Sequence, residues 1–115
     1  MAVTLYGIRT CDSVKKAQNW LKQNNVAFEL VDFKQLPPTE LQITQWSRTA
    51  GWEKLLNKQS KTFRELPSAE KSIQDEKQAI ALMQRHPLLI KRPVLVSEDK
   101  ILIGFSELAY NALNN

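Results

Sequence analysis

The chain has 115 residues, of which 43% are hydrophobic and 24% charged, and these proportions are typical of one soluble globular domain. One cysteine and one histidine exclude an internal disulfide and a Cys/His zinc site, and we expect no metal. The formal net charge is +4, but the basic residues are dispersed. This dispersal favours a solvated surface over a groove for nucleic acid.

The sequence carries no recognisable targeting segment. Its first residues lack the basic start and the apolar core of a signal peptide. No apolar stretch approaches the ~18 residues that a transmembrane helix needs. We therefore expect a cytoplasmic protein with no membrane contact, in which the single thiol stays reduced.

The first third of the chain predicts a β-α-β unit. Residues 2–6 are β-prone, residues 12–22 carry apolar side chains at helical spacing, and residues 27–33 are rich in Phe, Leu and Val. Thr10 and Asp12 are both candidate N-caps for the helix. A unit of this length implies a right-handed crossover.

The middle of the chain predicts a helical segment after Pro37-Pro38. In the first helix we expect Leu41 and Trp46 to be the apolar positions. His86-Pro87 ends the last one, because the residue before a proline is pushed out of the α region. The predicted helices are one that begins at residues 39–41 and ends at Gly51, a short one over residues 52–56, and one over residues 75–85.

The last third predicts a β-hairpin and a helix. Residues 93–96 and 101–103 are strands joined by a tight turn, and residues 106–113 form a helix with Leu108 among its apolar positions. The element order is that of a thioredoxin-like α/β domain with a mixed four-stranded sheet. We expect one such domain over residues 1–115, with a helical insertion over about 38–86.

Cys11 lies where the first strand gives way to the first helix. The unpaired N–H groups and the dipole of a helix N-terminus stabilise a thiolate, which is the nucleophilic form of cysteine. Arg9 and Lys15 are close in sequence and can add positive charge. Free cysteines are also often small buried hydrophobes, so position alone leaves reactive and structural roles equally open.

The third predicted strand begins at Pro93, and Lys91 and Arg92 come immediately before it. Thioredoxin-like domains keep a cis-proline at this place, where the preceding backbone is exposed to an extended thiol substrate. A proline also commonly marks the start of a strand. Without the context of Cys11, a cis bond would have only the base rate of ~5%.

The string Tyr6-Gly7-Ile8-Arg9-Thr10-Cys11-Asp12 resembles the active-site loop of the arsenate-reductase-like (ArsC/Spx) family. It is most similar to the YffB-type branch, whose members are regarded as glutathione-dependent thiol reductases. The resemblance implies a thioredoxin-like fold, a catalytic Cys11 and a cis-Pro93 after Arg92. Motifs that match in the same order cover nearly the whole chain, at residues 51–58, 66–67, 89–95 and 104–107.

The chain departs from the arsenate reductases of this family at the oxyanion site. Those enzymes use a cysteine with three arginines, of which Arg92 matches one, whereas Asn57 and Phe105 stand at the other two positions. The loss of two guanidinium groups removes most bidentate oxyanion contacts and argues against arsenate reduction. Lys15 stands where those reductases have an arginine four residues after the cysteine, so some positive charge is retained.

The Spx-type members of the family are transcription regulators that bind RNA polymerase, and many carry a Cys-x-x-Cys redox switch. Here Val14 takes the place of the second cysteine, which excludes an intramolecular disulfide. An adaptor that binds a protein without a redox switch stays open, with the exposed part of residues 39–66 as its interface.

The hypothesis that fits one cysteine is a glutathione-linked thiol-disulfide oxidoreductase. Without a resolving cysteine, Cys11 must form a mixed disulfide that glutathione or a glutaredoxin then releases, and a protein disulfide is a candidate substrate. Glutathione is anionic, so cations suit its binding. The candidate substrate-binding residues are Thr10 to orient the thiolate, Lys15, Lys91 and Arg92 for charge, Pro93 as a platform, and Asn57.

Overall fold

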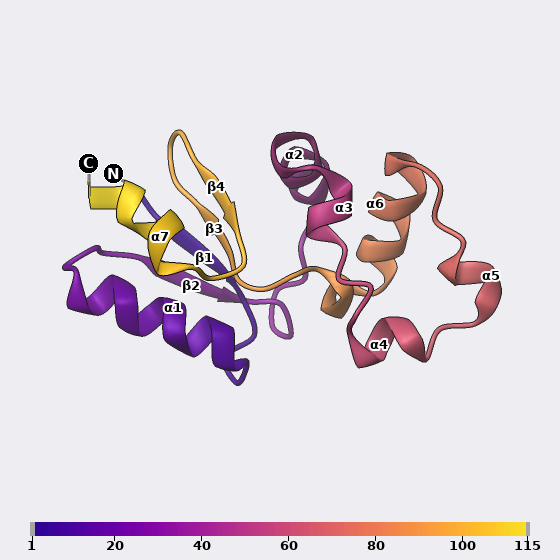
Figure 1. Cartoon of the computed structure of the whole chain (residues 1–115), viewed down its shortest axis with the longest axis horizontal. Helices are drawn as coiled ribbons and strands as arrows, with labels where there is room; N and C mark the ends of the chain where they lie inside the picture. The colour runs from indigo at the N-terminus through magenta and orange to yellow at the C-terminus, as the bar shows by residue number, and fades with distance from the viewer. Residues whose placement is uncertain (1, 115) are drawn as a thin grey trace. The chain divides into compact units, whose positions relative to one another are not determined.

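A computed structural model describes residues 2–114 of the chain. Contacts divide it into two compact units (Figure 1). The sheet unit comprises Met1–Leu36 and Arg92–Asn115, and the helical unit comprises Pro37–Lys91. The helical segment expected over about 38–86 falls in the second of these, while its description as an insertion into one domain stays a prediction. No helix within the described residues has the length and apolar character to cross a membrane.

The sheet unit contains a four-stranded mixed sheet in the order β2-β1-β3-β4. β1 pairs parallel with β2 and antiparallel with β3, and β3 pairs antiparallel with β4. This topology confirms the predicted thioredoxin-like fold. The elements are β1 Thr4–Gly7, α1 Asp12–Gln23, β2 Glu29–Asp32, β3 Val94–Val96, β4 Ile101–Ile103, α7 Glu107–Tyr110 and the 3-10 helix Asn111–Asn114.

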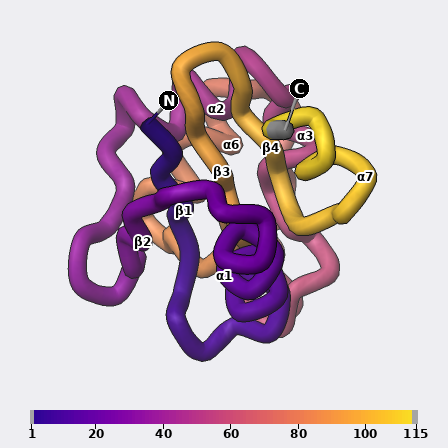
Figure 2. Tube along the Cα trace, turned by 90° about the vertical axis from the view of Figure 1, so that its left-hand side faces the viewer, coloured from indigo at the N-terminus to yellow at the C-terminus, as the bar shows by residue number. Residues whose placement is uncertain are grey.

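The register of the strands brings three chain segments to one edge of the sheet. Gly7 at the end of β1 pairs with Asp32 at the end of β2, and Tyr6 pairs with Val94 at the start of β3. The loop from β1 into α1 therefore begins beside the end of β2 and the start of β3. Figure 2 shows the chain turning back through this loop from β1 into α1.

α1 packs on the sheet through the apolar face that its periodicity predicts. Val14, Ala17 and Leu21 are fully buried, and they belong to one core with Leu5 and Leu95 of the sheet. Gly7 allows the close approach of β1 to α1, because a Cβ added there would lie 2.6 Å from Cγ2 of Val14. The packing of α1 thus places its N-terminus next to the end of β1.

The helical unit is built from short helices with well-defined ends. Thr39 caps α2 in a capping box with Gln42, and Asp75 caps α6 by accepting a hydrogen bond from the Gln78 N–H at 2.8 Å. Gly51 ends α2 with a φ of 93°. The helices are α2 Glu40–Ala50, α3 Trp52–Leu55, α4 Lys61–Arg64, α5 Ser68–Lys71, α6 Glu76–Arg85 and the 3-10 helix Pro87–Leu89.

Several local expectations were wrong. The N-cap of α1 is Cys11, whose carbonyl accepts the Lys15 N–H at 3.0 Å, so neither Thr10 nor Asp12 is the cap. Leu41 is 67% exposed, because it lies two residues from the buried Ile43 and hence on the opposite side of α2. Leu108 is 84% exposed for the same reason, since the buried Tyr110 faces the core instead. α4 and α5 were missed because four residues are too few for a periodic pattern.

Candidate functional site

Cys11 is half-buried and packs against the core of the sheet unit. It is the N-cap of α1, a helix of twelve residues, and its backbone is extended, with φ −73° and ψ 129°. Its N–H donates to the Ile8 carbonyl at 3.0 Å and closes a tight turn. Because first-turn N–H groups have no partner within a helix, Cys11 stands at a place that favours negative charge.

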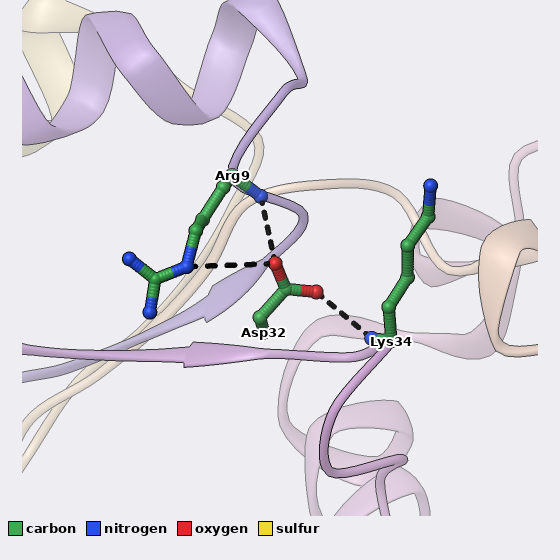
Figure 3. Close-up of polar contacts among 3 residues, drawn as sticks. All are labelled: Arg9, Asp32 and Lys34. Carbon is green, nitrogen blue, oxygen red and sulfur yellow. Dashed lines mark hydrogen bonds and ion pairs between the residues drawn. The ribbon is translucent and has the colours of Figure 1, made fainter.

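Asp32 holds the loop that leads to Cys11 (Figure 3). Its Oδ2 accepts the Arg9 backbone N–H at 3.2 Å, and its Oδ1 accepts the Lys34 backbone N–H at 2.8 Å. Nε of Arg9 also lies 3.8 Å from Oδ2. The carboxylate is buried, with 8% of the side chain exposed. The end of β2 is therefore tied to the loop between β1 and α1.

These contacts also control the charge of Asp32. The hydrogen bond from the Lys34 N–H lowers the pKa of the carboxyl below its ordinary value of 3.8. Burial acts in the opposite direction, and the Arg9 N–H and guanidinium lower the pKa further. Asp32 is accordingly ionised at neutral pH and accepts hydrogen bonds through both oxygens.

The start of β3 lies at the same edge of the sheet. The Arg92–Pro93 peptide is cis, as the resemblance implied. Pro93 is buried and its carbonyl accepts the Gly104 N–H at 2.8 Å, while the Arg92 side chain is half-buried. Since Val94 pairs with Tyr6 of β1, this segment borders the loop that carries Cys11.

The other predicted site residues fall into two groups. Thr10 and Lys15 are exposed on either side of Cys11. Asn57 and Lys91 belong to the helical unit, where both line a pocket of about 400 Å³ together with Lys54 and Lys58. Their participation in chemistry at Cys11 stays a prediction.

Asp32 is the residue that sequence reasoning missed, since no pairing in the sequence pointed to it. A signal was present: Asp32 ends the second strand of a β-α-β unit, and the ends of parallel strands meet at one edge of a sheet. Within residues 2–114, no three His, Cys, Asp or Glu side chains lie close enough to hold a metal ion.

Comparison with known proteins adds a family to this geometry. The sequence pattern of the ArsC family matches residues 6–113. An uncharacterized protein of Haemophilus influenzae is 40% identical over 111 residues, which cover 96% of each chain. The global transcriptional regulator Spx 2 of Oceanobacillus iheyensis is 30% identical, over 93% of this chain and 79% of its own. A solved structure described as a YFFB protein has a TM-score of 0.93, with 41% identity over 96% of both chains.

The family match spans both segments of the sheet unit and the helical unit between them. It includes Cys11 at the N-terminus of α1 and the Arg92–Pro93 peptide before β3. The chain belongs to the ArsC family.

Proposed function

We propose that the protein is a thiol-disulfide oxidoreductase that uses glutathione as co-substrate and acts through a mixed disulfide at Cys11. The observation that carries the proposal is the place of the one cysteine, at the N-terminus of α1. A helix N-terminus stabilises a thiolate relative to a thiol. Membership of the ArsC family supports a chemical role for this thiol.

The proposed cycle has two exchange steps. The Cys11 thiolate attacks the glutathionyl sulfur of a mixed disulfide, the old S–S bond breaks, and the substrate leaves as a thiolate that takes a proton. A second glutathione thiolate, or that of a glutaredoxin, then attacks the sulfur bound to Cys11. This step restores the Cys11 thiolate and releases a disulfide between the attacking thiol and the glutathionyl group, so that each cycle consumes one external thiol and frees the substrate as a thiol.

Residues of the sheet unit supply the binding groups in this proposal. Arg92 binds a carboxylate of glutathione, and Lys15 adds positive charge one helical turn after Cys11. Pro93 supplies a rigid surface against which the cysteinyl part of glutathione lies. Thr10 is next to the cysteine and orients the thiolate.

Residues of the helical unit extend the same proposal. Lys91 directly precedes Arg92 in the chain and adds to the positive charge that attracts glutathione. The Asn57 side chain accepts the Gln59 N–H at 3.1 Å through Oδ1, and its amide nitrogen is a donor for a carboxylate. A cytoplasmic location would supply the reduced glutathione that the cycle consumes.

The test is mass spectrometry after incubation with oxidised glutathione near neutral pH. We expect one glutathionyl adduct on the wild-type protein, its release by reduced glutathione, and no adduct on Cys11→Ser. The reaction should be at least about tenfold faster in the folded protein than in the same protein unfolded in urea, because only the fold places Cys11 at the N-terminus of α1. Equal rates in the two states, or the absence of an adduct, would contradict the proposal.

A second candidate is a protein-binding adaptor, which the 30% identity to the regulator Spx 2 favours. Its interface would be the exposed part of residues 39–66, where Leu41 is 67% exposed on α2. RNA polymerase is the partner to test by pull-down. Cys11→Ser should retain this binding, whereas Leu41→Glu should lose it.

Arsenate reduction is the third possibility, and we expect the protein to lack it. Asn57 and Phe105 occupy two positions at which arsenate reductases of the family carry oxyanion-binding arginines. An arsenate reduction assay with glutathione and a glutaredoxin checks this expectation.

A further inference from the structure

We infer that Asp32 is a positioning residue, which holds the loop before Cys11 so that the thiol stays at the N-terminus of α1. The inference rests on the proposed function and adds to it a residue that does not touch the substrate. Asp32 ends β2, and no chemistry in the cycle above requires its carboxylate as an acid or a base.

The carboxylate is held mainly through backbone N–H groups. A buried charge is costly unless hydrogen bonds compensate for it, and Asp32 accepts one from Arg9 and one from Lys34. The Arg9 side chain is 61% exposed and its Nε lies 3.8 Å from Oδ2, beyond hydrogen-bond distance, so water screens this ion pair and its contribution is small. The hydrogen bond to the Arg9 N–H therefore carries most of the effect on the loop.

This hydrogen bond acts on Cys11 through a short covalent path. Arg9 is the second residue of the turn that the hydrogen bond from the Cys11 N–H to the Ile8 carbonyl closes. A second tie anchors the same loop, because the Phe33 N–H donates to the Gly7 carbonyl at 2.8 Å. The end of β2 thus fixes the loop at residues 7 and 9, and the turn that follows presents Cys11 as the N-cap of α1.

The charge of Asp32 by itself would act in the opposite direction. A carboxylate near a thiol disfavours the thiolate, so removal of the charge alone should make Cys11 more reactive. Loss of the hydrogen bond should instead release the loop and make Cys11 less reactive, because misplacement by about 1 Å can cost a large rate factor. The sign of the change separates the two roles.

The experiment compares Asp32→Asn with wild type in two reactions of Cys11. Asn has the same shape but only one acceptor oxygen, so one of the two N–H groups loses its partner. We expect an about tenfold slower reaction with oxidised glutathione, and a pH profile for alkylation by iodoacetamide that moves to higher pH. Asp32→Glu keeps the charge and misplaces the acceptor, so its reaction rates should lie between those of wild type and those of Asp32→Asn. This variant also tests the inference if Asp32→Asn fails to fold.

Two control variants match the charge change. Glu29→Gln removes the same charge from an exposed position on the same strand and should leave both reactions unchanged. Arg9→Gln keeps the backbone N–H and should slow Cys11 less than Asp32→Asn does. Near-UV circular dichroism confirms that each variant is folded.

The outcomes distinguish this inference from the proposed function. If wild type forms no glutathionyl adduct, the proposed function fails, while the iodoacetamide profiles still test the role of Asp32. If folded Asp32→Asn reacts with iodoacetamide as fast as wild type or faster, Asp32 is not a positioning residue. The same conclusion follows if Asp32→Glu is indistinguishable from wild type.

Discussion

Cys11 has no second cysteine to work with, so the proposed cycle depends on other groups near it in the chain and the fold: the amides of α1, the cation of Lys15 and the carboxylate of Asp32. In the proposed function, the backbone N–H groups of α1 and the charge of Lys15 act on Cys11, and Asp32 holds the loop before it through the hydrogen bond from the Arg9 N–H. These contributions differ in range. The amides act only over the first turn of the helix and Asp32 acts by positioning the loop, whereas Lys15 is exposed and acts through a field that salt screens.

The contribution of Lys15 is testable against a matched lysine on the same helix. Lys15→Gln should slow the reaction of Cys11 with oxidised glutathione about threefold at low salt, because the substrate is anionic. Lys22→Gln removes the same charge from the last turn of α1 and should have no effect. Mass spectrometry at low and high salt measures these reaction rates. An equal decrease in rate in Lys15→Gln and Lys22→Gln would show that the net charge of the protein matters and the position of Lys15 does not.

At the scale of elements, the site depends on how closely β1 and α1 approach each other. Gly7 and Val14 set this distance, and α1 carries Cys11 at the end that faces the loop. The strand and the helix were both predictable from local patterns. The contact between them was not predictable. Glycine is needed at position 7 because of Val14, seven residues away, and only the packing of the helix on the strand brings Val14 close.

Gly7→Ala should therefore destabilise the fold by about 1–3 kcal/mol, because the new Cβ would overlap Val14. Urea denaturation measures the free energy of unfolding. The double variant Gly7→Ala/Val14→Ala removes the overlapping methyl groups and should cost less than the sum of the two single variants. Strict additivity would mean that these two residues do not limit the approach of β1 to α1.

At the scale of the whole molecule, two buried groups shape the dependence of stability on pH. The pKa of Asp32 is lowered in the folded state, chiefly by the Lys34 N–H, so its stabilisation is present above the ordinary pKa of 3.8 and is lost as pH falls below it. Burial raises the pKa of Tyr110 above its ordinary value of 10.0. Its contribution is present below pH 10 and is lost as pH rises, because only the unfolded state then ionises.

Free energies of unfolding measured from acid to alkaline pH test both ends of this profile. In Asp32→Asn the free energy of unfolding should decrease less as pH falls below about 4. In Tyr110→Phe it should decrease less as pH rises above about 10. The Tyr110 ring packs edge-to-face with Trp20 and Phe105, at 5.5 and 4.9 Å between centroids, and phenylalanine keeps both contacts. An unchanged alkaline limb in Tyr110→Phe would show that another group controls it.

Local sequence patterns were enough for most of the fold. Helical spacing over residues 12–22 and 75–85 predicted α1 and α6, and the turn between residues 96 and 101 predicted the β3–β4 hairpin. Local patterns failed where burial depends on a neighbour. Leu41 and Leu108 have apolar side chains but face away from the core, because Ile43 and Tyr110 determine which side of each helix packs.

The sequence by itself determined the order of the elements in the sheet unit and the place of Cys11 between a strand and a helix, since both follow from residue type and local periodicity. Only the tertiary structure decided which groups surround the loop before that cysteine. Asp32 meets Arg9 across 23 residues because the parallel register of β1 and β2 aligns their ends. That register arises from burying the apolar faces of separate segments together, and no local stretch of sequence specifies it.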